Sequence, residues 1–322
     1  MVNPQIENIK GSPFNWEVMV QAVKIARPVH WVKNLSLFAA LIFSGNLLVR
    51  SQMITVLFAF FSFSLATSAT YILNDILDAE SDKLHPIKKN RPIAAGKLPI
   101  YLALVEIAGL VLTSIFIASQ LNSLFLLTIV GYLSLQAAYS LGLKNIHIID
   151  ILIIAAGFVI RVYAGAFVIN VHLSVWFLLC VISTALFLAS GKRRAELNIL
   201  ETSGVTRKTL LKYQRELLNS FVTMFGNAAW MSWALFTFFE SPRASLPVWI
   251  VLAEISRTTT INKLLMITIP VVIFGIMRYQ SLIFESKSEA PERLLLTDKT
   301  LISSFVLWTV LVVWIIYGGL SI

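Results

Sequence analysis

The sequence predicts an all-α integral membrane protein with nine transmembrane helices. Three observations support this fold class. Hydrophobic residues make up 57% of the 322 residues and charged residues only 13%, well below the roughly 25% that is typical of soluble domains. The mean hydropathy is +0.79. Apolar runs of about 17–25 residues, long enough to cross a bilayer as helices, occur nine times along the chain.

The nine apolar runs are separated by two kinds of connection. Those near 119–122 and 171–173 are short and contain no Lys, Arg, Asp or Glu, whereas those at 78–98 and 191–218 are long and charged. The expected spans are 33–49, 54–77, 99–118, 123–141, 148–170, 174–190, 219–239, 263–283 and 301–321.

The first 30 residues precede these spans and are expected to form a cytoplasmic segment. They lack the basic start, apolar middle and small-residue exit of a cleavable signal peptide. Residues 12–26 predict a short helix, with Ser12 as the N-cap and Pro13 at the first helical position. This helix is too short to cross the bilayer, so we expect it to lie at the membrane surface.

The distribution of basic residues predicts the orientation. Of the 26 lysines and arginines, 21 flank the side that contains the N-terminus and 4 flank the other side, with Arg161 inside the fifth span. Because cytoplasmic loops carry the excess of Lys and Arg, the N-terminus is expected in the cytoplasm and the C-terminus outside the cell (inner) membrane. The net charge of +9 then reflects topology and anionic headgroups, and not nucleic-acid binding.

The chain shows no convincing internal repeat and no separate soluble domain. Residues 1–322 are therefore expected to form a single membrane-embedded domain. The one cysteine, Cys180, excludes an intramolecular disulfide and a cysteine-rich metal site. The sequence leaves the oligomeric state open.

An acidic motif lies at the cytoplasmic end of the second expected span. It consists of Asn74, Asp75, Asp78 and Asp82. On a helix, carboxylates at i, i+3 and i+7 lean toward one face, where they repel one another unless a cation lies among them. Their hard oxygen ligands suit Mg²⁺, which keeps its other positions for water and substrate phosphates. The spacing therefore predicts that these four residues bind Mg²⁺ and that the three aspartates are catalytic.

Basic residues follow the acidic motif directly. They are Lys83, His85, Lys88, Lys89 and Arg91. Since Arg91 precedes Pro92, which disfavours helix at that point, the metal-binding helix end is expected to open into a basic loop. A carboxylate-bound metal beside basic side chains is how proteins hold a diphosphate. The alternative is a juxtamembrane loop whose acids balance its bases, which explains the charge but not the spacing.

Arg161 lies in the middle of the fifth expected span. A central arginine costs about 2.5–3.5 kcal/mol on insertion scales, so it usually faces a cavity or a partner. Gly157 and Gly165 share its helical face and leave room for a ligand or for close packing. Asp150 is roughly 16 Å away along the helix axis, too far to pair directly. The structural alternative is an ion pair with Glu106 in the third span.

Other polar residues lie on the same side of the membrane as the aspartates. Interfacial anchoring is the common role of such residues, but their shared location favours an anion site. The predicted substrate-binding residues are Lys33, Asn74, Lys88, Arg91, Tyr139, Lys144, Arg161, Lys192 and Arg193.

The segment "NDILDAESD" resembles the N-D-x-x-D-x-x-x-D metal motif of the UbiA superfamily of intramembrane prenyltransferases. The segments "RPVHWVKN", "HPIKKNRPIAAG", "YSLGLK", "DILIIAAGFVIRVYAG" and "GKRRAEL" extend the resemblance over nearly the whole chain, toward the branch of decaprenyl-phosphate phosphoribosyltransferases. The resemblance implies a nine-helix bundle with a cavity that opens to the bilayer and is capped by cytoplasmic loops.

The sequence departs from the aromatic prenyltransferases of this superfamily at one place. Those proteins carry a second aspartate-rich motif in the loop after the sixth span. Here that loop begins with Lys192, Arg193 and Arg194 and contains no aspartate. One metal cluster facing a basic cluster suits phosphoribosyl diphosphate with a lipid monophosphate better than it suits a prenyl diphosphate.

The resemblance therefore implies a pentosyltransferase. It would use Mg²⁺ to transfer 5-phosphoribose from phosphoribosyl diphosphate to a polyprenyl (decaprenyl-like) phosphate, releasing pyrophosphate. One alternative is prenyl transfer from a prenyl diphosphate to an aromatic or other polar acceptor. The other is a membrane transporter, which predicts charges along a path through the bilayer, whereas here most charges gather at one face.

Overall fold

The computed structural model describes residues 16–85, 88–203, 213–240, 242, 259–285 and 297–319. Within these residues every regular element is a helix, which confirms the predicted all-α class. Ser12 and Pro13, the predicted start of the N-terminal helix, lie outside the described residues.

Seven helices in the described part of the chain are long and apolar enough to cross a membrane. They coincide with seven of the nine expected spans, and they make the chain a multi-pass membrane protein. These seven apolar helices of the described residues are α3 (Arg50–Leu77), α5 (Ile100–Leu121), α6 (Ser123–Leu141), α7 (Ile149–Val168), α8 (Val175–Ser203), α11 (Ile269–Glu285) and α13 (Lys299–Tyr317).

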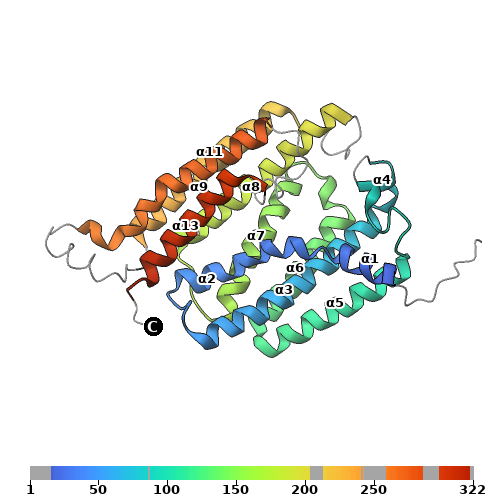
Figure 1. Cartoon of the computed structure of the whole chain (residues 1–322), viewed down its shortest axis with the longest axis horizontal. Helices are drawn as coiled ribbons and strands as arrows, with labels where there is room; N and C mark the ends of the chain where they lie inside the picture. Colours follow the sequence, from blue (N-terminus) through green and yellow to red (C-terminus); the bar gives the residue numbers. More distant parts are fainter. Residues whose placement is uncertain are drawn as a thin grey trace, which may run out of the picture.

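The helices form two groups joined in the middle (Figure 1). The first group contains α3, α5 and α6, and the second contains α9 (Arg215–Phe239), α11 and α13. Helices α7 and α8 lie between the two groups and pack on each other. The helix α9 covers the seventh expected span, but its N-terminal half carries the polar residues Asn219, Ser220, Thr223 and Asn227, and it is not among the seven apolar helices.

The first expected span, 33–49, is not one continuous helix. The chain there forms the 3₁₀ helix η1 (Pro28–Leu37) and the short helix α2 (Phe38–Phe43). Runs of 3₁₀ structure longer than three or four residues are uncommon, so tertiary contacts must hold this one. One such contact joins the buried Asn34 Nδ2 to Ser64 Oγ of α3 at 3.0 Å.

The predicted surface helix is present as α1 (Trp16–Ala26). Its Ile25 is fully buried and packs with Ile72 of α3 and Ile93. Apolar side chains elsewhere on α1 are exposed, including Trp16 and Val23. An amphipathic helix of this kind suits the boundary between headgroups and acyl chains.

Aromatic side chains close the end of the bundle that is far from the acidic motif. Phe43 of α2 contacts Phe177 of α8, Trp233 and Phe236 of α9 and Trp308 of α13, with ring centroids 4.9–6.4 Å apart. These contacts join the broken first span to the second helix group.

Helix α7 packs tightly on η1 at Gly165. A Cβ atom at this position would lie 2.0 Å from the carbonyl oxygen of Leu37, so only glycine allows the approach. This contact confirms that a small residue beside Arg161 permits close packing.

Gly165→Ala is expected to destabilise the protein because the methyl group would push α7 away from η1. The free energy of unfolding should fall by about 1–3 kcal/mol. Gly109→Ala in α5 is the matched control: its Cβ would meet no atom within 4 Å, so the change should be neutral or stabilising. Thermal unfolding in detergent compares the stability of the two variants. Equal stability would contradict the close packing of α7 on η1 at Gly165.

Candidate active site

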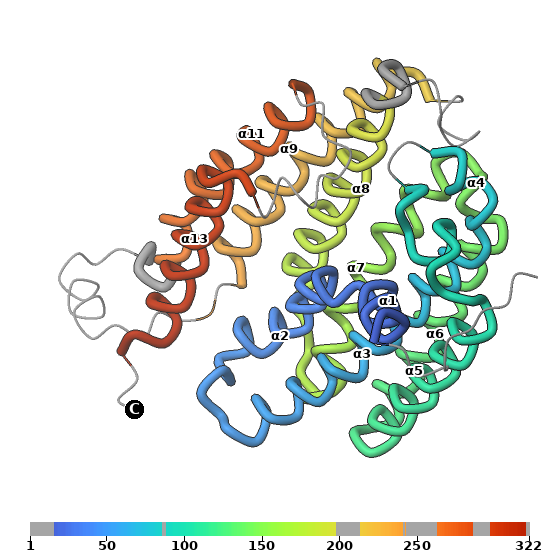
Figure 2. Tube along the Cα trace, turned by 45° about the vertical axis from the view of Figure 1, so that its right-hand side comes forward, coloured from blue at the N-terminus to red at the C-terminus, as the bar shows by residue number. Residues whose placement is uncertain are grey.

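The acidic motif lies where α3 ends and α4 (Ala79–Lys83) begins. Helical hydrogen bonds continue through this junction, from Asp78 N to Asn74 O at 2.9 Å and from Asp82 N to Asp78 O at 2.8 Å. The predicted helical spacing of the aspartates is therefore present. Figure 2 shows α4 and the C-terminal end of α8, drawn in yellow, at the same end of the molecule, as does Figure 1.

Asp75 is the most deeply buried of the three aspartates, with a side chain only 1% exposed. Arg27 Nη2 donates to both of its carboxylate oxygens, at 2.6 and 2.7 Å, and Arg91 Nη1 lies 3.0 Å from Oδ1. Arg27 has a left-handed backbone (φ 51°) directly before η1. Asp75 thus ties both η1 and the loop after α4 to the end of α3.

Arg27 was not among the predicted site residues. The sequence signal that could have identified it is its place at the start of "RPVHWVKN", a segment that already carried the family resemblance.

Arg91 bridges Asp75 and Asp82. Its Nη1 donates to Asp82 Oδ2 at 2.6 Å. Burial raises the pKa of the Asp82 carboxyl above its ordinary value, and the Arg91 guanidinium opposes this rise. Burial lowers the pKa of nearby His85, and the charges of Lys88 and Arg91 lower it further. His85 accepts a hydrogen bond from the Lys88 backbone through Nδ1 at 3.3 Å, as a neutral imidazole can.

Lys144 binds the remaining aspartate. Its Nζ lies 2.5 Å from Asp78 Oδ1 and 3.3 Å from Asn74 Oδ1, and Asn74 Nδ2 donates to Asp78 Oδ2 at 2.9 Å. The ammonium group therefore occupies a point at which two hard oxygen ligands converge. Lys144 is buried in the short 3₁₀ helix η3 (Leu143–Asn145).

Asn74 and Asp78 fit Mg²⁺, because a cation already lies between their oxygens and because this ion usually takes only one or two protein carboxylates. Asp75 and Asp82 instead bind arginines. Across the described residues, no three Asp, Glu, His or Cys side chains gather into a metal cluster. The structure thus divides the predicted motif between two kinds of partner, a lysine at Asp78 and arginines at Asp75 and Asp82.

A second charged cluster surrounds Arg193 of α8, whose side chain is 1% exposed. Its Nε lies 2.6 Å from Asp150 Oδ2 of α7, its Nη1 pairs with Glu196, and its Nη2 donates to Tyr139 Oη of α6 at 2.8 Å. The structure therefore brings together the predicted Tyr139 and Arg193. It also surrounds this arginine with the internal partners Asp150, Glu196 and Tyr139, whereas Lys192 beside it is only half-buried.

Arg161 is buried in the interior between η1, α6 and α7. It donates to Asn34 Oδ1 at 2.7 Å, to the Gly157 carbonyl at 2.6 Å and to Tyr132 Oη at 2.9 Å. Its guanidinium also lies 5.1–5.6 Å from the ring centres of Tyr132, Phe63 and Phe158. The alternative of an ion pair with Glu106 is wrong: neutral partners and aromatic rings satisfy the charge.

Lys33 lies on η1 and contacts α3 near its acidic end. Its Nζ lies 3.5 Å from Tyr71 Oη, one helical turn before Asp75. Lys33 and Lys88 are both half-buried, so these two predicted residues lie near the acidic motif with part of each side chain accessible.

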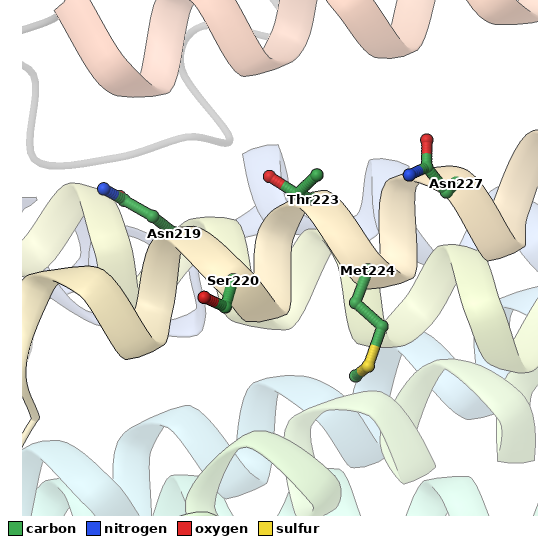
Figure 3. Close-up of a pocket in the computed structure, with 5 residues that line it drawn as sticks. All are labelled: Asn219, Ser220, Thr223, Met224 and Asn227. Carbon is green, nitrogen blue, oxygen red and sulfur yellow. The ribbon is translucent and has the colours of Figure 1, made fainter.

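A hollow of about 460 Å³ lies elsewhere, along α9. Its lining residues all come from that helix (Figure 3): Asn219, Ser220, Thr223, Met224 and Asn227. None of them is charged, so the hollow does not offer the groups that hold a diphosphate. The acidic end of α3 is therefore the candidate active site.

Comparisons with known proteins agree with this architecture. Residues 35–193 match the model of the UbiA prenyltransferase family. A UbiA homolog from Archaeoglobus fulgidus bound to GPP and Mg²⁺ has the same fold, with a TM-score of 0.67 over 94% of this chain and 100% of that chain at 15% identity. Curated sequence relatives at 34–38% identity span most of the chain. The chain belongs to the UbiA prenyltransferase family.

The curated relatives belong to a narrower class of protein than the one that the fold indicates. A decaprenyl-phosphate phosphoribosyltransferase from Corynebacterium glutamicum is 34% identical over 302 residues, which cover 92% of this chain and 86% of that protein. A protein of the same name from Mycobacterium tuberculosis is 38% identical over 221 residues, which cover 67% of this chain and 73% of that protein.

Arg193→Ala is expected to destabilise the protein, because it leaves Asp150 and Glu196 without their cation at a buried position. The free energy of unfolding should fall by about 3–5 kcal/mol. Lys192→Ala, one residue earlier, is the control and should change it by less than about 0.5 kcal/mol. Thermal unfolding in detergent compares the two, and an Arg193→Ala variant as stable as the control would refute its structural role.

Proposed function

We propose that this chain is a Mg²⁺-dependent polyprenyl-phosphate phosphoribosyltransferase. It transfers 5-phosphoribose from phosphoribosyl diphosphate to a polyprenyl phosphate and releases pyrophosphate. The observation that carries the proposal is the convergence of Asn74 and Asp78 on the Lys144 ammonium, beside Arg91 and Arg27. Metal-binding oxygens surrounded by cations are what a diphosphate requires. The names of the relatives from Corynebacterium and Mycobacterium support the same reaction.

In this proposal the acidic motif holds the donor. Asn74 and Asp78 would hold Mg²⁺, with Asp82 as a further ligand. The metal, when bound, offsets the charge that develops on pyrophosphate as the C1–O bond breaks. Lys144 and Arg91 each neutralise a carboxylate in the structure without a metal. Once a metal neutralises these carboxylates, both side chains are released to bind phosphate oxygens. Asp75 remains bound to Arg27 and holds that wall of the site in place.

The acceptor phosphate attacks C1 of the ribose. A new C1–O bond forms to the lipid phosphate, and the electron pair of the broken C1–O bond leaves with pyrophosphate. The lipid phosphate is already an anion near neutral pH, so no side chain has to remove a proton. Lys33, Lys88 and Lys192 are the candidates to bind phosphates of the two substrates. Holding both substrates in line supplies much of the rate.

Two of the predicted substrate-binding residues have structural roles in this proposal. Arg161 joins η1 to α6 and α7, and Arg193 joins α6, α7 and α8. Both shape the site without touching a phosphate. Tyr139 is oriented by Arg193, which donates to its hydroxyl.

We also propose the finer topology. The broken segment of η1 and α2, together with α9, completes nine crossings with the seven apolar helices. The N-terminus lies in the cytoplasm and the C-terminus outside the cell membrane, in a single catalytic domain. The excess of basic residues on the side of the acidic motif supports this orientation.

A direct assay tests the proposed reaction. Purified protein is incubated with Mg²⁺, labelled phosphoribosyl diphosphate and a polyprenyl phosphate, and a labelled lipid is expected. A labelled lipid that forms equally well with excess chelator, or none under any condition, would reject the proposal.

Asp78→Asn is expected to reduce transfer to the level measured without Mg²⁺, because the amide cannot replace the carboxylate as an anionic metal ligand. Glu80→Gln is the matched control: Glu80 lies two residues away, is exposed and pairs only with Lys83 among the described residues. It should retain activity within about twofold, since exposed ion pairs contribute little. Full Mg²⁺-dependent activity in Asp78→Asn would reject the metal role.

A further inference from the structure

Tyr213 lies two residues before α9 and joins the Arg193 cluster to another part of the chain. Its Oη donates to Asp150 Oδ1 at 2.6 Å and accepts the backbone N–H of Ile148 at 2.8 Å. The residue is 5% exposed, and its ring centre lies 3.9 Å from that of His147. One buried hydroxyl therefore binds both a carboxylate and a backbone amide.

Ile148 has an unusual backbone conformation. Its φ is 68° and its ψ is −43°, a region that a β-branched residue adopts only under strain. Strain of this kind persists where the surrounding structure holds it, and it clusters at functional sites. The hydrogen bond from Ile148 N to Tyr213 Oη is a contact that holds this backbone.

The strained residue belongs to the same short connection as Lys144. This connection joins α6 to α7, and it is bound at two points. Lys144 binds Asp78 and Asn74, and four residues later Ile148 binds Tyr213. The position of Lys144 therefore depends on two anchors, of which only the first belongs to the acidic motif.

The Tyr213 hydroxyl remains protonated, as this double contact requires. Burial and the hydrogen bond to Asp150 raise the pKa of Tyr213 above its ordinary value. The proton lies toward Asp150, and the oxygen lone pair remains available to Ile148 N–H.

We propose that Tyr213 is a positioning residue for Lys144. By fixing the backbone at Ile148, it holds the connection between α6 and α7 so that the Lys144 ammonium reaches the acidic motif and, with substrate present, the donor's diphosphate. This role adds a positioning residue to the proposed function, and it rests on that function only for the identity of the diphosphate.

The test compares Tyr213→Phe with Tyr317→Phe. Tyr317 is a matched control at the far end of the bundle: it is also buried, at 7% exposure, and its Oη donates to the Ile42 carbonyl at 2.6 Å and accepts Leu47 N–H at 3.2 Å. Each variant loses one hydroxyl that binds a backbone amide. Both should therefore lose stability, and Tyr213→Phe should lose more because it also gives up the hydrogen bond to the buried Asp150 carboxylate.

Binding of inorganic pyrophosphate with Mg²⁺ separates the two variants. The pyrophosphate concentration that gives half of the thermal stabilisation should rise about tenfold in Tyr213→Phe, the effect of losing one well-placed charged contact. The KM for phosphoribosyl diphosphate should rise by a similar factor. Tyr317→Phe should change neither. An unchanged pyrophosphate requirement in Tyr213→Phe, or the same change in both variants, would overturn the proposal.

Hydrogen exchange of the unaltered protein provides a second measurement, which is decisive if Tyr213→Phe does not fold. Binding of Mg²⁺ and pyrophosphate should slow exchange of the Ile148 amide, which Tyr213 holds, and not only of the amides beside Lys144, because linkage is reciprocal. Unchanged exchange would overturn the proposal. If pyrophosphate behaves as expected but the unaltered protein forms no labelled lipid, the proposed function fails while the role of Tyr213 stands.

Discussion

The ion pair between Asp75 and Arg27 is the interaction on which the architecture of the site depends. A carboxylate that is 1% exposed cannot remain charged without a partner, because the cost of removing it from water is several kcal/mol. Arg27 meets this requirement from a position 48 residues earlier in the chain. It does so with a left-handed backbone that turns the chain into η1. The carboxylate thereby determines where the broken first span begins.

The same constraint organises the other segments around the end of α3. Asp82 draws in Arg91, and Asp78 draws in Lys144 from the connection between α6 and α7. Each cation comes from a different part of the chain, so neutralising the charges also assembles the walls of the site. In the proposed function, Asp78 and Asp82 exchange these partners for Mg²⁺ and a diphosphate without leaving a charge unpaired. Under that proposal the paired state is a preorganised form of the binding site.

Local sequence patterns predicted the features that depend on near neighbours. The apolar runs predicted the long helices, and the spacing of Asp75, Asp78 and Asp82 predicted a helical motif whose hydrogen bonds continue through α4. The same patterns failed at 33–49, because the bond between Asn34 and Ser64 that holds η1 on α3 joins residues 30 positions apart.

Long-range partners were beyond the reach of the sequence. Arg161 was recognised as a buried charge, but its neutral partners Asn34 and Tyr132 lie 127 and 29 residues away. The helical pattern relates Asp150 only to Arg161 on its own helix, whereas its cation is Arg193 on the next one. A helical pattern specifies which face a residue occupies, and only the packed fold specifies what that face meets.

One measurement tests the central claim most directly: a high-resolution map of the protein in lipid nanodiscs with Mg²⁺ and phosphoribosyl diphosphate. The account predicts a cation on Asp78 and Asn74 that also touches the diphosphate, with Lys144 and Arg91 turned from their carboxylates onto phosphate oxygens. A map in which both basic side chains keep their aspartate partners, and the donor binds elsewhere, would contradict it.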